Sequence, residues 1–168
     1  MGRVAVTGLG VISALGNSVH SNHAALLKGT CGITSGELVK TRYADYLLFG
    51  EVKSDNDSLK SILNITDQSA TRTSLLALHA FREAITDCGL DASLIAGSDT
   101  ALIGASTVGG MSQTDELYHD AKSEKVGSVY MSSYDCASVT LFLQRKYNIK
   151  GIANTINTAC SSSANSIM

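Results

Sequence analysis

Residues 152–164 read Ile-Ala-Asn-Thr-Ile-Asn-Thr-Ala-Cys-Ser-Ser-Ser-Ala, a stretch of mixed polar and apolar residues that runs directly into small side chains. The first part, residues 152–157, is typical of a strand, and the small residues after it are typical of the start of a helix. Cys160 therefore stands at a strand-to-helix junction. A side chain on such a tight turn needs small neighbours two positions away, and Thr158 and Ser162 are both small. The stretch has the pattern of a nucleophile elbow.

A cysteine at this kind of junction has a chemical advantage. In the first turn of a helix, the unpaired backbone N–H groups and the helix dipole favour the thiolate, which is the nucleophilic form. The same N–H groups are able to stabilise an oxyanion. We therefore predict Cys160 to be a nucleophile, although free cysteines are just as often buried thiols with a structural role.

The rest of the chain alternates strand and helix patterns. The clearest helix ends at Gly89, and its apolar residues recur every three or four positions. We expect strands at residues 3–8, 46–52, 100–105 and 152–157, and helices at 18–28, 58–63, 67–88, 138–147 and 159–168. Alternation of this kind predicts an α/β layered fold.

Composition narrows the possible functions. With 168 residues, of which 44% are hydrophobic, the chain has material for one compact domain. A formal charge of −2 lacks the basic excess that nucleic-acid binding needs. No stretch approaches the roughly 20 apolar residues of a membrane span, and the first residues do not resemble a signal peptide. We expect a soluble, cytoplasmic protein that binds neither nucleic acid nor membrane.

Neither the cysteines nor the histidines are spaced as metal ligands. The four cysteines lie far apart, which predicts reduced thiols and no zinc site: Cys31, Cys88, Cys136 and Cys160. His20 and His23 are able to share a helix face, but two ligands are too few for a metal site.

A dinucleotide-binding function is the first alternative. Gly8-Leu9-Gly10 follows an expected strand, as a dinucleotide fingerprint does. The third glycine of that fingerprint is replaced by Ser13, and no acidic residue follows at the end of a second clear strand. The pattern therefore argues against nucleotide binding.

The segment around Cys160 resembles a known active-site signature. Residues 158–163, Thr-Ala-Cys-Ser-Ser-Ser, are similar to the signature of the β-ketoacyl-acyl carrier protein synthases, condensing enzymes of the thiolase-like superfamily. Residues 3–16 resemble that family's amino-terminal strand and loop. Three further segments follow in the family's order, at residues 82–90, 103–110 and 147–151, so the resemblance covers essentially the whole chain. Ala14 stands where the family usually has proline, and Thr107 where glycine is common.

The resemblance implies a thiolase-like fold, with a mixed sheet flanked by helices, and a two-step Claisen condensation. Cys160 takes an acyl group from an acyl carrier protein thioester, and a malonyl-carrier thioester then decarboxylates and attacks the acyl-enzyme. The backbone N–H of Cys160 is implied as an oxyanion-hole donor. Val108 matches a position that meets the acyl chain in relatives, although an ordinary packed valine is an equal alternative. No metal or redox cofactor is implied.

The family also needs two basic residues that support decarboxylation, and these come from its carboxyl-terminal half. None of this chain's histidines matches them: His20, His23, His79 and His119. Residues 1–168 are therefore expected to be the amino-terminal part of a ketosynthase domain and unable to complete condensation alone. The resemblance further implies a homodimer joined through the strand at residues 152–157.

Two alternative functions are compatible with the same thiolase-like fold. A non-catalytic or complementing thiolase-like subunit, such as a chain-length factor, generally lacks the nucleophile, whereas Cys160 is present here. A coenzyme A-dependent thiolase has a different sequence around its cysteine. A comparison of carrier-protein and coenzyme A acyl donors separates the thiolase from the synthase.

Overall fold

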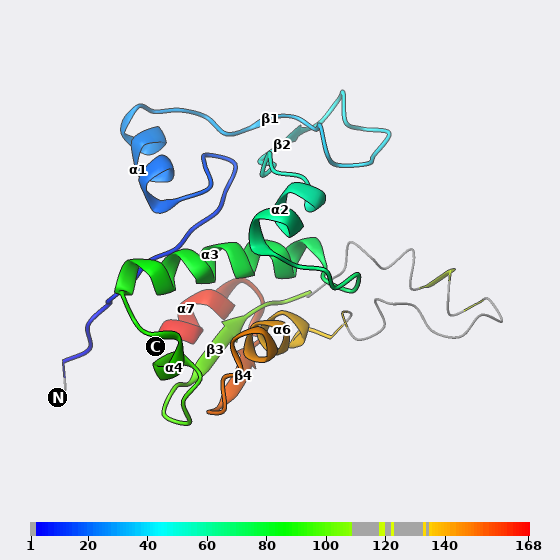
Figure 1. Ribbon diagram of the computed structural model, residues 1–168. Coiled ribbons are helices and arrows are strands. Elements are labelled where there is room, and N and C mark those ends of the chain that lie inside the picture. Colours follow the sequence, from blue (N-terminus) through cyan, green and yellow to red (C-terminus); the bar gives the residue numbers. More distant parts are fainter. Residues whose placement is uncertain (1–2, 109–117, 120–121, 123–132, 134) are drawn as a thin grey trace. The chain divides into compact units, whose positions relative to one another are not determined.

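A computed structural model describes residues 3–108, 118–119, 122, 133 and 135–168 of the chain (Figure 1). These residues divide into two compact units rather than the one core expected from the length. Unit 1 contains Met1–Asn64 and Leu78–Gly89, and unit 2 contains Ile65–Ala77 and Leu90–Met168. The long helix α3, Arg72–Cys88, contributes residues to both.

The helices of unit 1 begin and end at residues that the local chemistry favours. Helix α1, Val19–Leu27, starts at a capping box in which Ser18 and Ser21 bond each other's backbone N–H. Helix α2, Asn56–Leu63, is capped by Asp55, whose carboxylate accepts the N–H of Ser58 at 2.7 Å. Both helices confirm the expected positions to within two residues.

The expected strand at residues 3–8 does not form. The side chains of Val4 and Val6 are 97% and 79% exposed, so this segment is not the buried strand that its β-branched residues predicted. Among the described residues it has no ladder partner. Just beyond it, the N–H of Leu9 donates to the Asp87 carboxylate of α3 at 2.9 Å. β-Branched composition predicts a strand only where a neighbouring strand is available to pair.

Two glycines let this amino-terminal arm run against α3. A Cβ atom at Gly8 would overlap the carbonyl oxygen of Ala84, and a Cβ at Gly10 would overlap that of Ala80. The glycines that resemble a nucleotide-binding turn therefore serve a close approach of backbone to helix. Farther along, Glu83 of α3 accepts the backbone N–H of Val11 at 2.9 Å.

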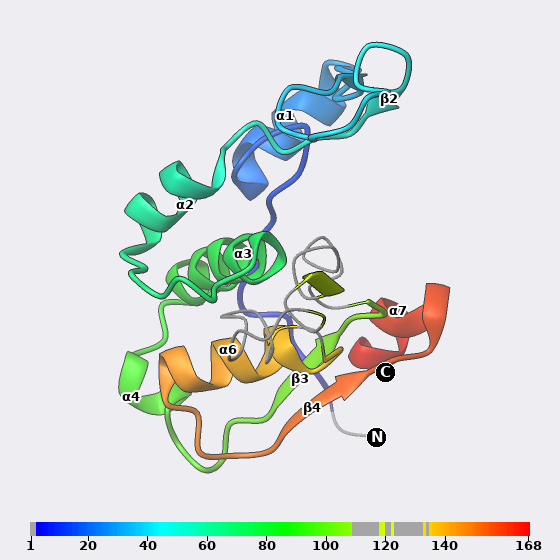
Figure 2. The same cartoon turned by 90° about the vertical axis from the view of Figure 1, so that its right-hand side faces the viewer.

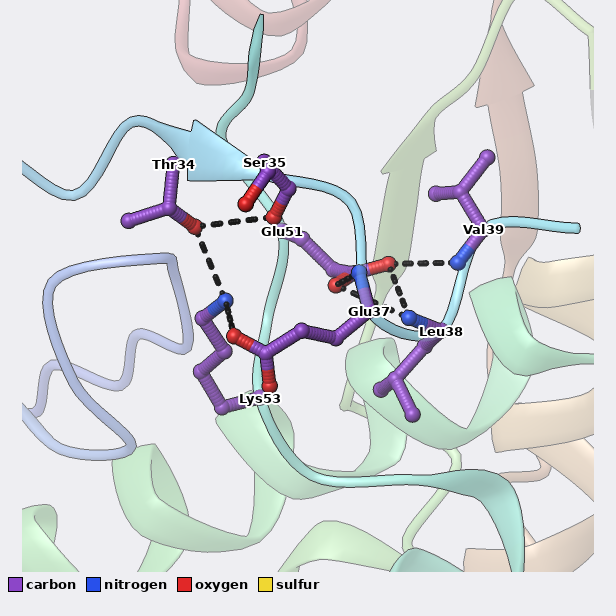
Figure 3. Close-up of polar contacts among 7 residues, drawn as sticks. All are labelled: Thr34, Ser35, Glu37, Leu38, Val39, Glu51 and Lys53. Atoms are coloured by element: carbon purple, nitrogen blue, oxygen red, sulfur yellow. Dashed lines mark hydrogen bonds and ion pairs between the residues drawn. The ribbon is translucent and has the colours of Figure 1, made fainter. Parts of the chain in front are cut away.

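A short hairpin in unit 1 is held by one buried carboxylate. Strands β1, Thr34–Ser35, and β2, Leu48–Phe49, pair antiparallel. Glu51, only 7% exposed, accepts backbone N–H groups from the three consecutive residues 37–39 (Figure 3). These N–H groups, first that of Glu37, hold the pKa of Glu51 below its ordinary value of 4.5 despite the opposing effect of burial. The expected strand at residues 46–52 is thus shortened to two residues, and β1 was not expected.

Unit 2 is built around a parallel pair of strands. Strand β3, Leu102–Ala105, pairs with β4, Ala153–Ile156, in the register Leu102↔Ala153. One further bond at each end extends the ladder, from the N–H of Leu102 to Ile152 at 2.8 Å and from that of Ser106 to Ile156 at 3.4 Å. Figure 2 shows the two strands side by side. Both strands confirm the sequence prediction.

Helices α6, Ser138–Tyr147, and α7, Ser162–Ile167, each contact both strands. The bounds of α6 confirm the prediction, and the helix ends at Asn148, whose φ of 51° is left-handed. Gly104 of β3 leaves room for Thr140 of α6. The Thr140 and Thr155 hydroxyls lie 2.7 Å apart and join α6 to β4. The apolar core of this unit includes Ile95, Leu102, Phe142, Leu143 and Ile149.

Several expected elements differ in extent. Helix α3 begins at Arg72 rather than at residue 67, and a short helix α4, Ala92–Ile95, was not expected. The helix expected at residues 159–168 is divided into a 3₁₀ turn, η3 at Ala159–Ser161, and α7. The predicted mixed sheet is represented, in the described part of the chain, by one parallel and one antiparallel pair of strands. No helix there is both long and apolar enough to cross a bilayer.

Candidate active site

The candidate site lies in unit 2, where the two parallel strands end. Since β3 and β4 are parallel, their carboxyl ends meet at one edge of the sheet. Thr107 and Val108 follow β3, and residues 157–160 follow β4. The predicted nucleophile and the predicted acyl-chain residue therefore come from neighbouring strand ends. Gly109 and Gly110, where a turn was predicted, lie outside the described residues.

The backbone turns sharply at the residue before Cys160. Ala159 has a φ of 50°, in the left-handed region that side chains other than glycine rarely occupy. Holding an alanine there costs about 1–2 kcal/mol. Such a conformation persists only where surrounding contacts hold it, and it concentrates at functional sites. The strained residue of the predicted elbow is thus Ala159, and Cys160 follows it in η3.

Ser162 supplies the closest of these contacts. Its side chain is buried, at 5% exposure, and its hydroxyl oxygen lies 2.9 Å from the backbone nitrogen of Thr158, whose N–H it accepts. The same hydroxyl donates to the carbonyl oxygen of Ala159 at 2.8 Å. Ser162 therefore bridges the two sides of the turn with one side chain.

Thr107 reaches the turn from the other strand. Its hydroxyl donates to the carbonyl oxygen of Ala159 at 3.3 Å. Its own carbonyl oxygen accepts from the thiol of Cys136 at 3.1 Å and from the side-chain amide of Asn157 at 3.5 Å. The amide of Asn157 also lies 3.4 Å from the Cys136 sulfur. These contacts join the ends of β3 and β4 next to the turn at Ala159.

A second set of hydrogen bonds fixes Thr158. Ser161 donates its hydroxyl to the Thr158 carbonyl at 2.9 Å. Asn165, on α7, donates its side-chain amide to the Thr158 hydroxyl at 2.8 Å. Thr158, the residue before the strained alanine, is thus tied both to Ser161 in the turn and to Asn165 on α7.

Cys160 itself is exposed, which contradicts the reading of a buried structural thiol. The 3₁₀ turn around it replaces the first turn of the continuous helix that the sequence predicted. Val108 is 50% exposed and directly follows Thr107. Thr107 is hydrogen-bonded to Ala159. Val108 and Cys160 each directly follow one of these two residues in the sequence.

Sequence reasoning recognised the turn but not what holds it. The sequence predicts that Thr158 and Ser162 avoid a clash because they are small, whereas the structure shows both in specific hydrogen bonds. The sequence distinguishes Thr107 only as a departure from the glycine that is common at this position in the family. Cys136 is one of four widely spaced cysteines, and nothing in its local sequence predicts the contact with Asn157.

Three of the four histidines belong to unit 1 and not to the unit that holds the candidate site. His20 and His23 are exposed on α1 of unit 1. The Nε2 atom of His79 lies 2.7 Å from the carbonyl oxygen of Asn17, also in unit 1. Within the described ranges, no three His, Cys, Asp or Glu side chains are grouped so that they could hold a metal ion.

The sequence matches one protein family over its whole length. Residues 1–168 match the family described as "Beta-ketoacyl synthase, N-terminal domain". A curated relative, 3-oxoacyl-[acyl-carrier-protein] synthase 1 of Escherichia coli (strain K12), is 27% identical over 175 residues. The alignment covers 99% of this chain and 42% of that protein, so the chain spans less than half the length of this relative.

Solved structures show the same fold. The ishigamide ketosynthase/chain length factor matches with a TM-score of 0.79 at 21% identity, covering 92% of this chain and 40% of that one. A type II polyketide acyl-carrier protein in complex with its ketosynthase matches with a TM-score of 0.69 at 19% identity, covering 99% and 45%. The expectation of an α/β, thiolase-like ketosynthase fold is confirmed.

Proposed function

Because the chain belongs to the beta-ketoacyl synthase family, as an N-terminal domain of that family, we propose that its protein condenses acyl and malonyl thioesters carried on an acyl carrier protein. The observation that carries this proposal is the exposed Cys160 directly after the strained Ala159. A strained turn that presents a thiol to solvent suits nucleophilic catalysis. The name of the curated relative supports a carrier-protein substrate.

The first step is acyl transfer to Cys160. The thiolate attacks the carbonyl carbon of the acyl-carrier thioester, and a tetrahedral intermediate with a negative oxygen forms. The carbon–sulfur bond to the carrier then breaks, and the carrier leaves as a thiolate that takes up a proton. The products are an acyl-Cys160 thioester and the free carrier protein.

The second step extends the acyl chain by two carbons. A malonyl-carrier thioester loses carbon dioxide, and the electron pair of the broken carbon–carbon bond forms a carbanion stabilised by its thioester. The carbanion attacks acyl-Cys160, the bond to the cysteine sulfur breaks, and a β-ketoacyl-carrier thioester is released. In the family that the sequence resembles, the two bases that support decarboxylation come from the carboxyl-terminal half, whereas residues 1–168 match the N-terminal domain.

Two residues of the site take further proposed roles. The backbone N–H of Cys160 donates to the oxygen that becomes negative in the first step. Val108, half exposed beside the elbow, contacts the acyl chain and limits its accepted length. The chemistry of neither step requires a metal or redox cofactor. A cytoplasmic homodimer joined through β4 remains the expectation from the family resemblance.

The test is capture of the acyl-enzyme. The intact protein is mixed with an acyl-loaded carrier protein, and the denatured mass is measured before malonyl-carrier is added. We expect an increase equal to one acyl group, located by peptide mapping on Cys160, and no increase in Cys160→Ala. Cys31→Ala is the matched control, because Cys31 is also an exposed thiol but lies in unit 1.

The same experiment distinguishes the two alternatives. Acylation by a coenzyme A ester but not by the carrier thioester would indicate a thiolase. Absence of acylation with both donors would indicate a non-catalytic subunit and refute the proposal. Acylation of the Cys160→Ala protein at another residue would overturn the assignment of the nucleophile.

A further inference from the structure

We infer that Thr107 and Ser162 are positioning residues that together orient the backbone N–H of Cys160 toward the developing oxyanion. This inference rests on the proposed function, since it concerns the acyl-transfer step of the same site. The observation behind it is that two hydroxyl groups, one from Thr107 after β3 and one from Ser162 at the start of α7, donate to one carbonyl oxygen, that of Ala159.

The link between that carbonyl and the nucleophile is covalent. The C=O of Ala159 and the N–H of Cys160 belong to the same peptide unit, which is planar and trans. In a trans peptide the two groups point in opposite directions. Hydrogen bonds that fix the direction of the Ala159 carbonyl therefore also fix the direction of the Cys160 N–H. They also polarise the peptide, which strengthens the N–H as a donor.

The local backbone alone does not hold this peptide in place. Ala159 has a φ of 50°, so without external contacts the chain gains about 1–2 kcal/mol by rotating to the right-handed region. Such a rotation would turn the peptide between Ala159 and Cys160. Ser162 opposes it from the helix side, with the hydroxyl at 2.8 Å and its own N–H donating to the same oxygen. Thr107 opposes it from the β3 side at 3.3 Å.

Thr107 is itself held in position. The thiol of Cys136 and the amide of Asn157 both donate to its carbonyl oxygen, at 3.1 and 3.5 Å. The position of the hydroxyl is therefore tied to the end of β4 as well as to β3. Glycine, which is common at this position in the family that the sequence resembles, has no hydroxyl to offer. The contact from Thr107 is thus a feature of this chain and not a general requirement of the fold.

The test separates acyl transfer from alkylation in the intact protein. Attack on a thioester forms an oxyanion, whereas alkylation of Cys160 by iodoacetamide does not. We expect Thr107→Val and Ser162→Ala each to lower kcat for acyl transfer about 3- to 10-fold, with KM unchanged, because each change removes a hydroxyl that donates to the Ala159 carbonyl. The rate of Cys160 alkylation should change by less than about twofold. Thr107→Ser, which restores the hydroxyl, should recover most of the rate.

Matched controls remove the same chemical groups elsewhere. Thr86→Val deletes an exposed threonine hydroxyl that donates to a helix carbonyl, and Ser166→Ala deletes a serine hydroxyl on α7. Both should leave acyl transfer unchanged. If Thr107→Val matches Thr86→Val, if KM rises while kcat stays constant, or if alkylation falls in parallel with acyl transfer, the inference is wrong.

A second measurement does not depend on the proposed function. In isotope-labelled protein, the amide resonance of Cys160 reports the direction and polarisation of its peptide. We expect Thr107→Val and Ser162→Ala to shift this resonance, and Thr86→Val and Ser166→Ala to leave it in place. If the wild-type protein is never acylated, the proposed function fails while this shift still tests the positioning role. An unshifted resonance in both variants overturns it.

Discussion

The carboxylate of Glu51 accepts the backbone N–H of Val39 at 2.7 Å. It also accepts the N–H groups of Glu37 and Leu38, so a single side chain satisfies three consecutive donors (Figure 3). A pair of exposed residues, Lys53 and Glu37, adds an ion pair at 2.7 Å beside this cluster. The loop after β1 is thus organised by an ionised acid rather than by a sheet.

Glu51 should make the stability of unit 1 dependent on pH. Its pKa is lowered in the folded protein, chiefly by the N–H of Glu37, so its contribution is present above the unfolded value of 4.5 and is lost as pH falls through the lower folded pKa. We expect Glu51→Gln to lower the urea midpoint at pH 7. The difference from wild type should shrink below pH 4.5.

Asp45→Asn is the control for the loss of one carboxylate charge, because Asp45 is an exposed carboxyl of the same segment. Its urea midpoint at pH 7 should match that of the wild type. A Glu51→Gln midpoint that stays equally far below wild type at all pH values would show that the ionised carboxylate is not what stabilises the loop.

Gly10→Ala should destabilise the amino-terminal arm. The added methyl group would overlap the Ala80 carbonyl, which belongs to a helix backbone and cannot move aside cheaply. We expect a loss of about 1–3 kcal/mol in unfolding free energy. Gly50→Ala is the matched control, since its Cβ would meet nothing closer than Ala14 at 3.9 Å. Equal stability of the two variants would contradict the close approach of the arm to α3.

Gly104→Ala should destabilise the packing of α6 on β3, by about 1–3 kcal/mol, because its methyl group would overlap the hydroxyl of Thr140. Thr140→Ala removes that hydroxyl and opens the space, although it also breaks the contact with Thr155. The double variant should therefore be more stable than the sum of the single changes predicts, by at least about 0.5 kcal/mol. Strict additivity in denaturant unfolding would show that the two side chains do not meet.

Val108 should influence the length of acyl chain that the protein accepts, if the proposed function holds. Val108→Phe adds bulk beside the elbow and should lower the acylation rate with long acyl-carrier thioesters at least tenfold more than with short ones. Val108→Ala, which removes bulk, should shift the preference toward longer acyl chains. Leu94→Ala is a control for an exposed apolar residue of the same unit. An equal effect of Val108→Phe on all chain lengths would place the acyl chain elsewhere.

The parts of the fold that the sequence predicted well are those with a local cause. Helix α6 and strands β3 and β4 follow from their own periodicity and from the turn at Asn148. The segment at residues 3–8 has an equally strong β-branched pattern, yet it forms no strand. A strand depends on its neighbours, whereas an amphipathic helix carries most of its signal within itself.

In the candidate site, too, the features with a local cause were predictable from the sequence and those that depend on distant residues were not. The position of Cys160 on a tight turn was predictable, because a turn between strand and helix requires small residues nearby in sequence. The contact from Thr107 to Ala159 joins residues 52 positions apart and depends on how β3 and β4 pair. Periodicity carries no information about such a contact, and the same holds for the thiol of Cys136 beneath it.

The parallel pairing of β3 and β4 has a consequence for biosynthesis. Leu102 and its partner Ala153 are separated by about fifty residues, so β3 is synthesised well before the strand that completes it. At 5–20 residues per second, this interval lasts roughly 3–10 seconds. During that time the nascent chain carries an unpaired strand edge, and Ile103 is 42% exposed even after pairing. The elbow at Cys160 therefore forms only after β4 has been synthesised, and chaperone protection is most valuable in the interval between the synthesis of β3 and that of β4.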